Sequence, residues 1–316
     1  MSAGDLKRPA AAALLLALVA AGACRTGPQN SSGRQPSAAT SPEHLHRVIA
    51  AVRPSHTPMG PPRPGDWLTT TEEPGQTFDQ YLRSNPVRAE GARRTLYVQP
   101  LGPFTPPQRR IVELTAEFMS RFFALPVRVR PDAPLEGVPA HARRTHPSWG
   151  DEQIQAGHIT MNILRPALPE DAVAMIGFTA SDLFPDEHMN FVFGQASLTE
   201  RVGVWSLYRL GDPGADEPSF RLTLLRTMKI AAHETGHMFS LPHCTAYECV
   251  MCGSNSLPET DRRPLDACPE CTAKICWATG AGPRERYSRL AEFLRAQGFA
   301  HEASAFEARA SALSKI

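Results

Sequence analysis

Four residues between positions 233 and 243 combine three metal ligands with a general base. His233 and His237 are four residues apart, so on a helix both imidazoles project from one face and can hold a single metal ion. Glu234 lies beside the first of these ligands, where it could take a proton from a bound water. Pro242 ends the helix, and the turned chain can bring His243 round as a third ligand. Three histidines and a water leave an open position, which is typical of a catalytic zinc and not of a structural one.

Four cysteines after the third histidine form a second candidate metal site. In chain order they are Cys244, Cys249, Cys268 and Cys271. Their pattern, C-x4-C-x18-C-x2-C, gives two close pairs separated by a loop, which suits a structural zinc held by four thiolates. Disulfides are the alternative in a secreted domain, because six cysteines, an even number, remain when Cys24 is set aside. Cys252 and Cys276 are then spare thiols, alternative ligands or one disulfide.

Periodicity in the rest of the chain predicts the elements that position these residues. After Pro218, apolar residues recur at helical spacing for about six turns and lead into His233. Thr105 and Pro106 are a good cap and first turn for another helix. Strands are predicted at 95–100, 125–130, 171–179, 190–197 and 201–210, and further helices at 151–164 and 284–313. Strands and helices alternate before a long helix, so we expect an α/β or α+β architecture in one domain.

Composition limits the partners that the chain can have. Its 316 residues suffice for one substantial core. Lys plus Arg number 33 and Asp plus Glu 32, which gives a formal net charge of +1. This balance argues against a nucleic-acid partner, which would usually require a basic stripe. The arginine-rich stretch 142–144 is interpreted as a solvated loop.

The first 24 residues carry the pattern of an export signal. Lys7 and Arg8 precede an apolar run at 10–21, and small residues follow up to Cys24. A basic start, an apolar run of about a dozen residues and a small-residue cleavage site describe a secretory signal peptide. A cysteine directly after such a site resembles the lipobox of bacterial lipoproteins, although Ala21 stands where leucine is usual. We therefore expect export, with attachment to a membrane only through an acylated Cys24 (periplasmic or at the cell surface), or otherwise secretion.

Residues 25–65 are expected to form a disordered tether. They are rich in Gly, Ser, Pro, Gln and Thr, so they cannot bury enough apolar surface to fold alone. A short helix at 44–52 is the one element that this stretch could form. Residues 66–316 are then the folded domain.

The segment from His233 to Cys271 resembles the archaemetzincins, a small branch of the metzincins. Their pattern is a zinc-binding helix that ends in a third histidine, then a cysteine, a methionine turn and a closing C-x2-C. Further similarity lies upstream, at 76–81, 96–101, 172–185 and 190–197. The resemblance covers most of 70–280 and implies a metzincin-like zincin domain with a mixed twisted sheet, a long active-site helix and C-terminal helices.

The resemblance also implies an activity and its residues. The chain would be a zinc-dependent metallopeptidase with two zinc ions, acting on peptide or protein substrates as an aminopeptidase or an endopeptidase. Apart from the resemblance, we expect the chain to be a monomer. The three histidines would hold the catalytic zinc and the four cysteines the structural zinc. Glu234 would be the general base, and Met251 would lie beneath the metal. The run 190–197 would form the upper rim of the cleft.

One residue departs from the family's pattern. Ser240 stands three residues after the second histidine, where metzincins have glycine. A positive φ there would cost serine about 1 kcal/mol, unless Pro242 sets a different turn. If the turn misplaces His243, the chain is instead a catalytically impaired zinc-binding surface protein; if the cysteines pair with each other, it is a disulfide-stapled one. Tyr247 and His188 are weaker candidates for contact with substrate, since packing and surface roles are simpler.

Overall fold

The computed structural model describes residues 38–197 and 199–316, so the predicted signal peptide, Cys24 and the first part of the predicted tether lie outside it. All described residues belong to one compact unit. The strands are β1 (Thr95–Leu101), β2 (Val127–Val129), β3 (Arg143–Thr145), β4 (Glu152–Gln155), β5 (Ala172–Thr179), β6 (Asp182–Phe184), β7 (Gly194–Ala196) and β8 (Val202–Ser206). The helices are α1 (Pro42–Val52), α2 (Phe78–Arg83), α3 (Pro106–Phe122), α4 (Ala156–His158), α5 (Glu217–Met238), α6 (Leu257–Arg262), α7 (Pro269–Thr279), α8 (Pro283–Ala296) and α9 (Ala300–Ala312). Short helical turns are η1 (Ala38–Thr40), η2 (Arg53–Ser55), η3 (Trp67–Thr69), η4 (Ala140–Ala142), η5 (Ile159–Leu164) and η6 (Leu313–Lys315).

Within the described residues, five strands form a mixed sheet in the order β2-β1-β5-β8-β7. The pairs β1–β2, β1–β5 and β5–β8 are parallel, whereas β7 runs antiparallel to β8 and forms one edge. A second sheet of three short strands has the order β3-β4-β6. This mixed α/β architecture confirms the predicted fold class.

The two faces of the larger sheet are covered by different helices. On one face, apolar side chains such as Val98, Phe178 and Trp205 share a core with α3 and α5. On the other face, alternate residues such as Met175 and Val204 pack with the segment that contains α4 and η5. Because strand side chains alternate between faces, the buried strands are mostly apolar on both faces, as in a parallel sheet covered on both sides.

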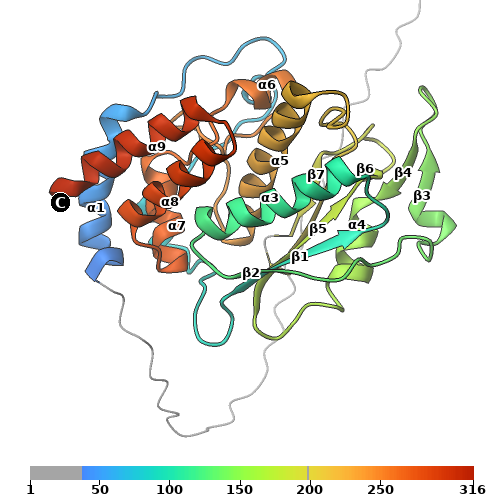
Figure 1. Cartoon of the computed structure of the whole chain (residues 1–316), viewed down its shortest axis with the longest axis horizontal. Coiled ribbons are helices and arrows are strands. Elements are labelled where there is room, and N and C mark those ends of the chain that lie inside the picture. Colours follow the sequence, from blue (N-terminus) through green and yellow to red (C-terminus); the bar gives the residue numbers. More distant parts are fainter. Residues whose placement is uncertain (1–37, 198) are drawn as a thin grey trace, which may run out of the picture. The chain divides into compact units, whose positions relative to one another are not determined.

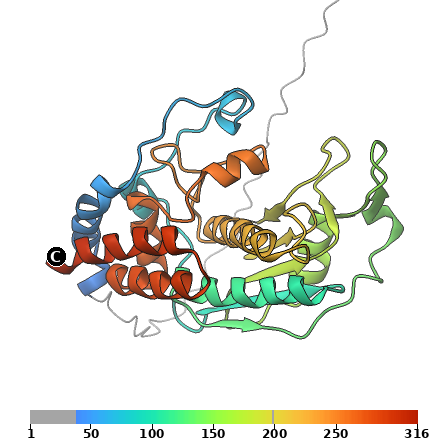
Figure 2. The same ribbon diagram turned by 45° about the horizontal axis from the view of Figure 1, so that its top comes forward.

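The four helices α1, α7, α8 and α9 gather to one side of the strands, as Figures 1 and 2 show. Helix α5 runs between this helical group and the sheet, and its C-terminal end carries the candidate metal ligands. None of the helices in the described part of the chain is long and apolar enough to cross a membrane.

Helix α1 falls inside the stretch that we expected to be a tether. Its residues Leu45, Val48, Ile49 and Val52 are buried in the main core, and α1 packs mainly against α7. Their spacing is that of an amphipathic helix. The folded unit therefore includes residues before position 66, and the boundary expected there is placed too late.

The helix expected at 151–164 begins as a strand. Glu152–Gln155 is β4, which pairs with β3 on one side and β6 on the other. Helical turns start only at Ala156, with the π-helical turn η5 at the end. Pairing with two strands decides the conformation of these four residues, which local pattern alone could not reveal.

Candidate metal centres and active-site cleft

Helix α5 presents the two histidines of the HExxH segment on one face. The helix is capped by Asp216, whose carboxylate accepts a hydrogen bond from the Ser219 amide at 2.8 Å. The Nε2 atoms of His233 and His237 lie 3.0 Å apart, and Nε2 of His243 lies 3.2 Å from that of His233. The structure therefore brings the three predicted ligands together.

Main-chain oxygens fix the orientation of the first two imidazoles. Nδ1 of His233 donates to the carbonyl of Val250 at 2.9 Å, and Nδ1 of His237 donates to that of Leu241 at 2.7 Å. Because a carbonyl can only accept, each Nδ1 carries the proton and each Nε2 presents its lone pair. Burial and the neighbouring imidazole of His243 lower the pKa of His237 to about 4, which keeps this ring neutral at physiological pH.

The third histidine is oriented by a residue far away in the sequence. Nδ1 of His243 donates to Oε1 of Glu73 at 2.6 Å, and the indole of Trp67 packs edge-on against its ring at 5.4 Å. Neither Glu73 nor Trp67 was among the predicted site residues. Carboxylate partners of this kind set the tautomer and raise the basicity of a ligand histidine.

Three Nε2 lone pairs that face one another at this distance fit a bound cation. As acceptors they cannot hydrogen-bond among themselves. A tetrahedral zinc with bonds of about 2.0–2.1 Å to nitrogen requires the nitrogens to lie about 3.3 Å apart. The observed separations are 3.0 and 3.2 Å, so the donor set suits zinc.

The turn between the helix and His243 has a positive φ at Ser240, the conformation for which metzincins use glycine. Ser240 has φ 63°, in the left-handed region, so the alternative of a different turn set by Pro242 is wrong. The amide of Leu241 donates to the carbonyl of Gly236 at 3.1 Å and closes the turn. Oγ of Ser240 accepts a hydrogen bond from the Val87 amide at 3.2 Å, a contact that glycine could not make. His243 thus reaches the other two ligands despite the serine.

Glu234 lies half-buried in the cleft between α5 and the sheet edge. Burial raises the pKa of its carboxyl to about 7. The nearest strand is β7, where a Cβ added to Gly194 would lie 3.4 Å from Cγ of Glu234. Glycine at this position therefore lets the edge strand approach the carboxylate closely.

Met251 packs directly under the metal-binding turn of α5. It is fully buried, and a Cβ added to Gly236 would lie 2.5 Å from its sulfur. Gly236 sits between His233 and His237, so the thioether occupies the space beneath both ligands. This is where the family resemblance places the methionine.

The four cysteines of the predicted structural site converge in the core. Their sulfurs lie within 4.8 Å of one another, and Sγ of Cys244 is 3.6 Å from that of Cys268. A disulfide requires about 2.05 Å, whereas two thiolates on one zinc with bonds of about 2.3 Å lie about 3.8 Å apart. All six cysteines in the described residues are free. Of the remaining two, Cys252 approaches the carbonyl of Tyr247 and Cys276 is buried in α7.

A cavity of about 500 Å³ opens beside the histidines. The segment 188–194 lines one side of it, and 250–264 contributes much of the other. His188 is among the lining residues, whereas Tyr247 is not. Arg144, expected in a solvated loop, instead donates to the carbonyls of Met189 and Asn190 at 2.7 and 2.9 Å, and so holds the segment that borders the cavity.

These features together define a zinc metallopeptidase of zincin type. They are a long helix with two histidines and a carboxylate, a third histidine after a turn, and an edge strand across the cleft. Peptidase family M54 matches residues 163–276. Archaemetzincin-2 of Macaca fascicularis is 34% identical over 285 residues, which cover 77% of this chain and 77% of that protein. Archaemetzincin-2 of Homo sapiens is 34% identical over 281 residues, again with 77% of each covered. A crystal structure of archaemetzincin from Methanopyrus kandleri is similar at 33% identity and a TM-score of 0.48, over 58% of this chain and 94% of that one.

The chain belongs to the archaemetzincin family, as these relatives show. It is accordingly a zinc metallopeptidase, and its substrates are peptides or proteins.

Loss of the Glu73 carboxylate is expected to weaken zinc binding. Glu73→Ala removes the acceptor that orients His243, which should lower zinc affinity about 10- to 100-fold, the usual cost of losing such a partner. Glu73→Gln keeps an acceptor oxygen and should lose less. Competition with a chromogenic chelator measures the affinity. The control is Glu72→Ala, an exposed neighbour; equal affinities of Glu73→Ala and Glu72→Ala would remove this role.

Proposed function

We propose that the chain hydrolyses peptide bonds by attack of a water molecule from which Glu234 takes the proton. His233, His237 and His243 would hold the zinc ion, which when bound supplies Lewis-acid polarisation of a carbonyl and makes water acidic near neutral pH. Glu234 would later give the proton to the departing amine, as a general base and acid in turn. The observation that carries this proposal is the convergence of three Nε2 lone pairs beside a half-buried carboxylate in one cleft.

The edge strand β7 supports a peptide as substrate. Among the described residues it is the last strand of the sheet and pairs with β8 alone, and Gly194 lines the cavity. An extended peptide could therefore add to this edge by main-chain hydrogen bonds, which would place its carbonyl groups along the cleft.

We also propose two zinc ions per chain. The second ion would be held by the four thiolates of Cys244, Cys249, Cys268 and Cys271. These fill all four coordination positions, as in a structural site. That ion would fix the segment that follows His243 and carries Met251. Its support is the 3.6 Å separation of the Cys244 and Cys268 sulfurs.

Metal removal tests the proposed activity. The purified chain is expected to cleave members of a mixed peptide library, to lose this activity with a zinc chelator, and to regain it when zinc is added back. Peptides with free and with acetylated N-termini in the same library separate aminopeptidase from endopeptidase cleavage. Circular dichroism checks that the chelated chain remains folded. Cleavage that persists without zinc, or no cleavage by the zinc-loaded chain, would contradict the proposal.

Export remains a proposal that rests on the first 24 residues. We infer that Cys24 is acylated after cleavage of the signal peptide, because it directly follows the small residues of a cleavage site. Labelling with a fatty-acid analogue should mark the wild-type chain and not Cys24→Ser. Equal labelling of both chains would remove the lipid anchor.

A further inference from the structure

Two cations line the cavity beside the histidines, Lys229 on α5 and Arg263 at the end of α6. Lys229 and Arg263 both line it, and both are nearly buried, with exposed fractions of 5% and 9%. Among the described residues around this cavity, the only carboxylate is Glu234, which the proposed reaction uses. Glu248 and Glu259, which pair with Arg263, do not line the cavity, so among the described lining residues Lys229 is the cation whose charge no carboxylate pairs.

The ammonium of Lys229 has one hydrogen-bond donor that is not used by the carbonyls it contacts. It donates to the carbonyls of Thr260 and Asp261, both at 3.0 Å, and an ammonium has three protons. It forms no ion pair within the described part of the chain, although the charges of Asp261 and Glu302 oppose the effect of burial, which lowers the pKa of Lys229 to about 8. A buried cation without a paired anion is costly, and an anionic ligand would offset that cost.

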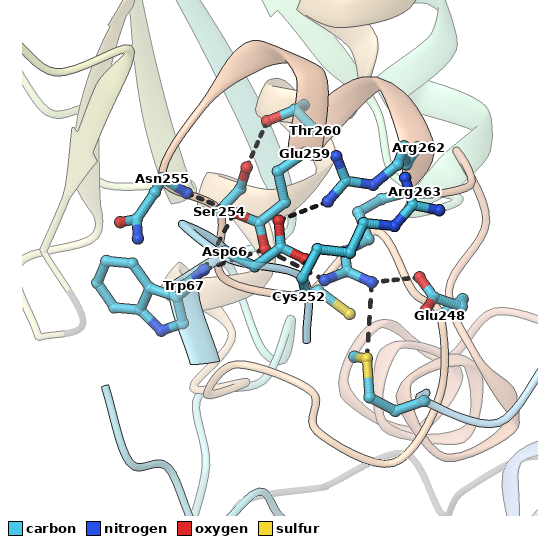
Figure 3. A network of polar contacts seen from close by, with 12 residues as sticks. Asp66, Trp67, Glu248, Cys252, Ser254, Asn255, Glu259, Thr260, Arg262 and Arg263 are labelled. Carbon is cyan, nitrogen blue, oxygen red and sulfur yellow. Dashed lines mark hydrogen bonds and ion pairs between the residues drawn. The ribbon is translucent and has the colours of Figure 1, made fainter. Parts of the chain in front are cut away.

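Arg263 is held in place by two carboxylates that do not line the cavity. One terminal nitrogen pairs with Glu248 and the other with Glu259 at 3.2 Å, as Figure 3 shows. Glu259 is itself fully buried and accepts hydrogen bonds from the amides of Trp67 and Asn255. Nε of Arg263 is buried and has no hydrogen-bond partner. The guanidinium is thus fixed in place with one donor unused.

Both cations share the cavity with the metal ligands His233 and His243. Lys229 precedes His233 by four residues on α5, so it lies on the same face about 6 Å away along the axis. Ile230, Val250 and Pro264 also line the cavity and supply apolar surface for the stem of a side chain. A substrate group that enters beside the scissile bond could therefore reach both cations.

We propose that the part of the cavity lined by these two cations binds a carboxylate of the substrate, with Lys229 as the principal partner and Arg263 as the second. The carboxylate comes from an aspartate or glutamate side chain beside the scissile bond or from the C-terminus of a short peptide. The inference rests on the proposed peptidase function and adds a substrate class to it.

Binding of matched peptides tests the proposal without cleavage. The host is the zinc-loaded variant Glu234→Gln, and the probes are labelled, C-terminally amidated peptides that differ only in Glu, Gln, Leu or Lys at one position, moved in turn along the peptide. At one position Glu is expected to bind about 10- to 100-fold more tightly than Gln, the worth of a charged hydrogen bond, and Lys most weakly. A Leu peptide with a free C-terminus tests whether the C-terminal carboxylate, and not an acidic side chain, is the group that binds. Equal affinity for Glu and Gln at every position, with no effect of the free C-terminus, would overturn the inference.

A pair of lysine variants assigns the effect. Lys229→Met should reduce the Glu-to-Gln affinity ratio to near 1, whereas Lys274→Met should leave the ratio unchanged. Lys274 is the matched control because it is equally buried, donates to the carbonyl of Gln76 and does not line the cavity. The ratio is insensitive to partial unfolding of either variant. An unchanged ratio in Lys229→Met would contradict the assignment. Cleavage of the same peptides by the wild-type chain is scored separately, so that a failure of catalysis is distinguished from a failure of this recognition.

Discussion

Replacing Glu234 by glutamine is expected to lower kcat/KM for peptide cleavage by at least about 100-fold, the low end of what a general base contributes. The amide keeps the size of the side chain but cannot take a proton from water. Glu234 does not contact the three Nε2 atoms as a ligand, so zinc content should stay the same. Steady-state kinetics on a cleaved library peptide and elemental analysis measure the two quantities.

The control for this variant is Glu217→Gln, at the exposed start of the same helix. It should match the wild type in activity, zinc content and melting temperature. Cleavage by Glu234→Gln at the rate of Glu217→Gln would remove Glu234 from the mechanism.

Titration of the Glu234 carboxylate is expected to set the acid limb of the pH profile of kcat/KM. Burial raises the pKa of Glu234 to about 7 in the metal-free chain, and a dication nearby would lower it. Since a general base must be ionised, kcat/KM should fall as the pH drops, with an apparent pKa no higher than about 7. The residual activity of Glu234→Gln should lack this limb; a limb of the same pKa in both chains would assign it to another group.

The second large effect is expected for Cys268→Ser. Cys268 is fully buried at the start of α7, and its sulfur belongs to the cluster that fits a structural zinc. Loss of one thiolate should release that zinc and lower the free energy of unfolding by more than about 4 kcal/mol, because metal binding at such a site is part of folding. Denaturant unfolding and zinc analysis measure both.

Cys276→Ser is the matched control for this prediction. Cys276 is a fully buried cysteine in the same helix but lies outside the cluster. Its replacement should cost about 1 kcal/mol, the centre of the range for point variants, and leave the zinc content unchanged. If both serine variants lost the same stability and neither lost zinc, the four sulfurs would be core residues and not ligands.

Sequence patterns predicted those site residues whose positions depend on local spacing along the chain. His233, Glu234 and His237 are set by the helical repeat, and their helix forms where the apolar periodicity placed it. The cysteine spacing likewise identified the set of sulfurs that converge. The amphipathic pattern of α1 was present too, but the surrounding proline-, glycine- and serine-rich composition favoured a tether.

Long-range contacts account for what the sequence did not reveal. Glu73 contacts His243 across 170 residues, and no local pattern marks an acidic residue as the partner of a particular histidine. The contact of Arg144 with the segment that borders the cavity, and the place of Lys229 in the cavity wall, were not predicted, because only the folded chain brings these segments together. The conformation of β4 depends in the same way on β6, from which it is separated by a helical segment and β5.

The turn at Ser240 shows how a local cost is offset by such contacts. Its positive φ disfavours serine, but its hydroxyl accepts the Val87 amide and Glu73 orients the histidine that follows. The position of His243 therefore depends on the N-terminal segment as well as on the turn.

The metal content of the purified chain tests the central claim most directly. Elemental analysis of the wild type, His237→Ala and Cys271→Ser should give two, one and one zinc per chain, with peptide cleavage lost in His237→Ala. A wild-type chain without zinc, or a His237→Ala chain with the same zinc content as the wild type, would contradict the account.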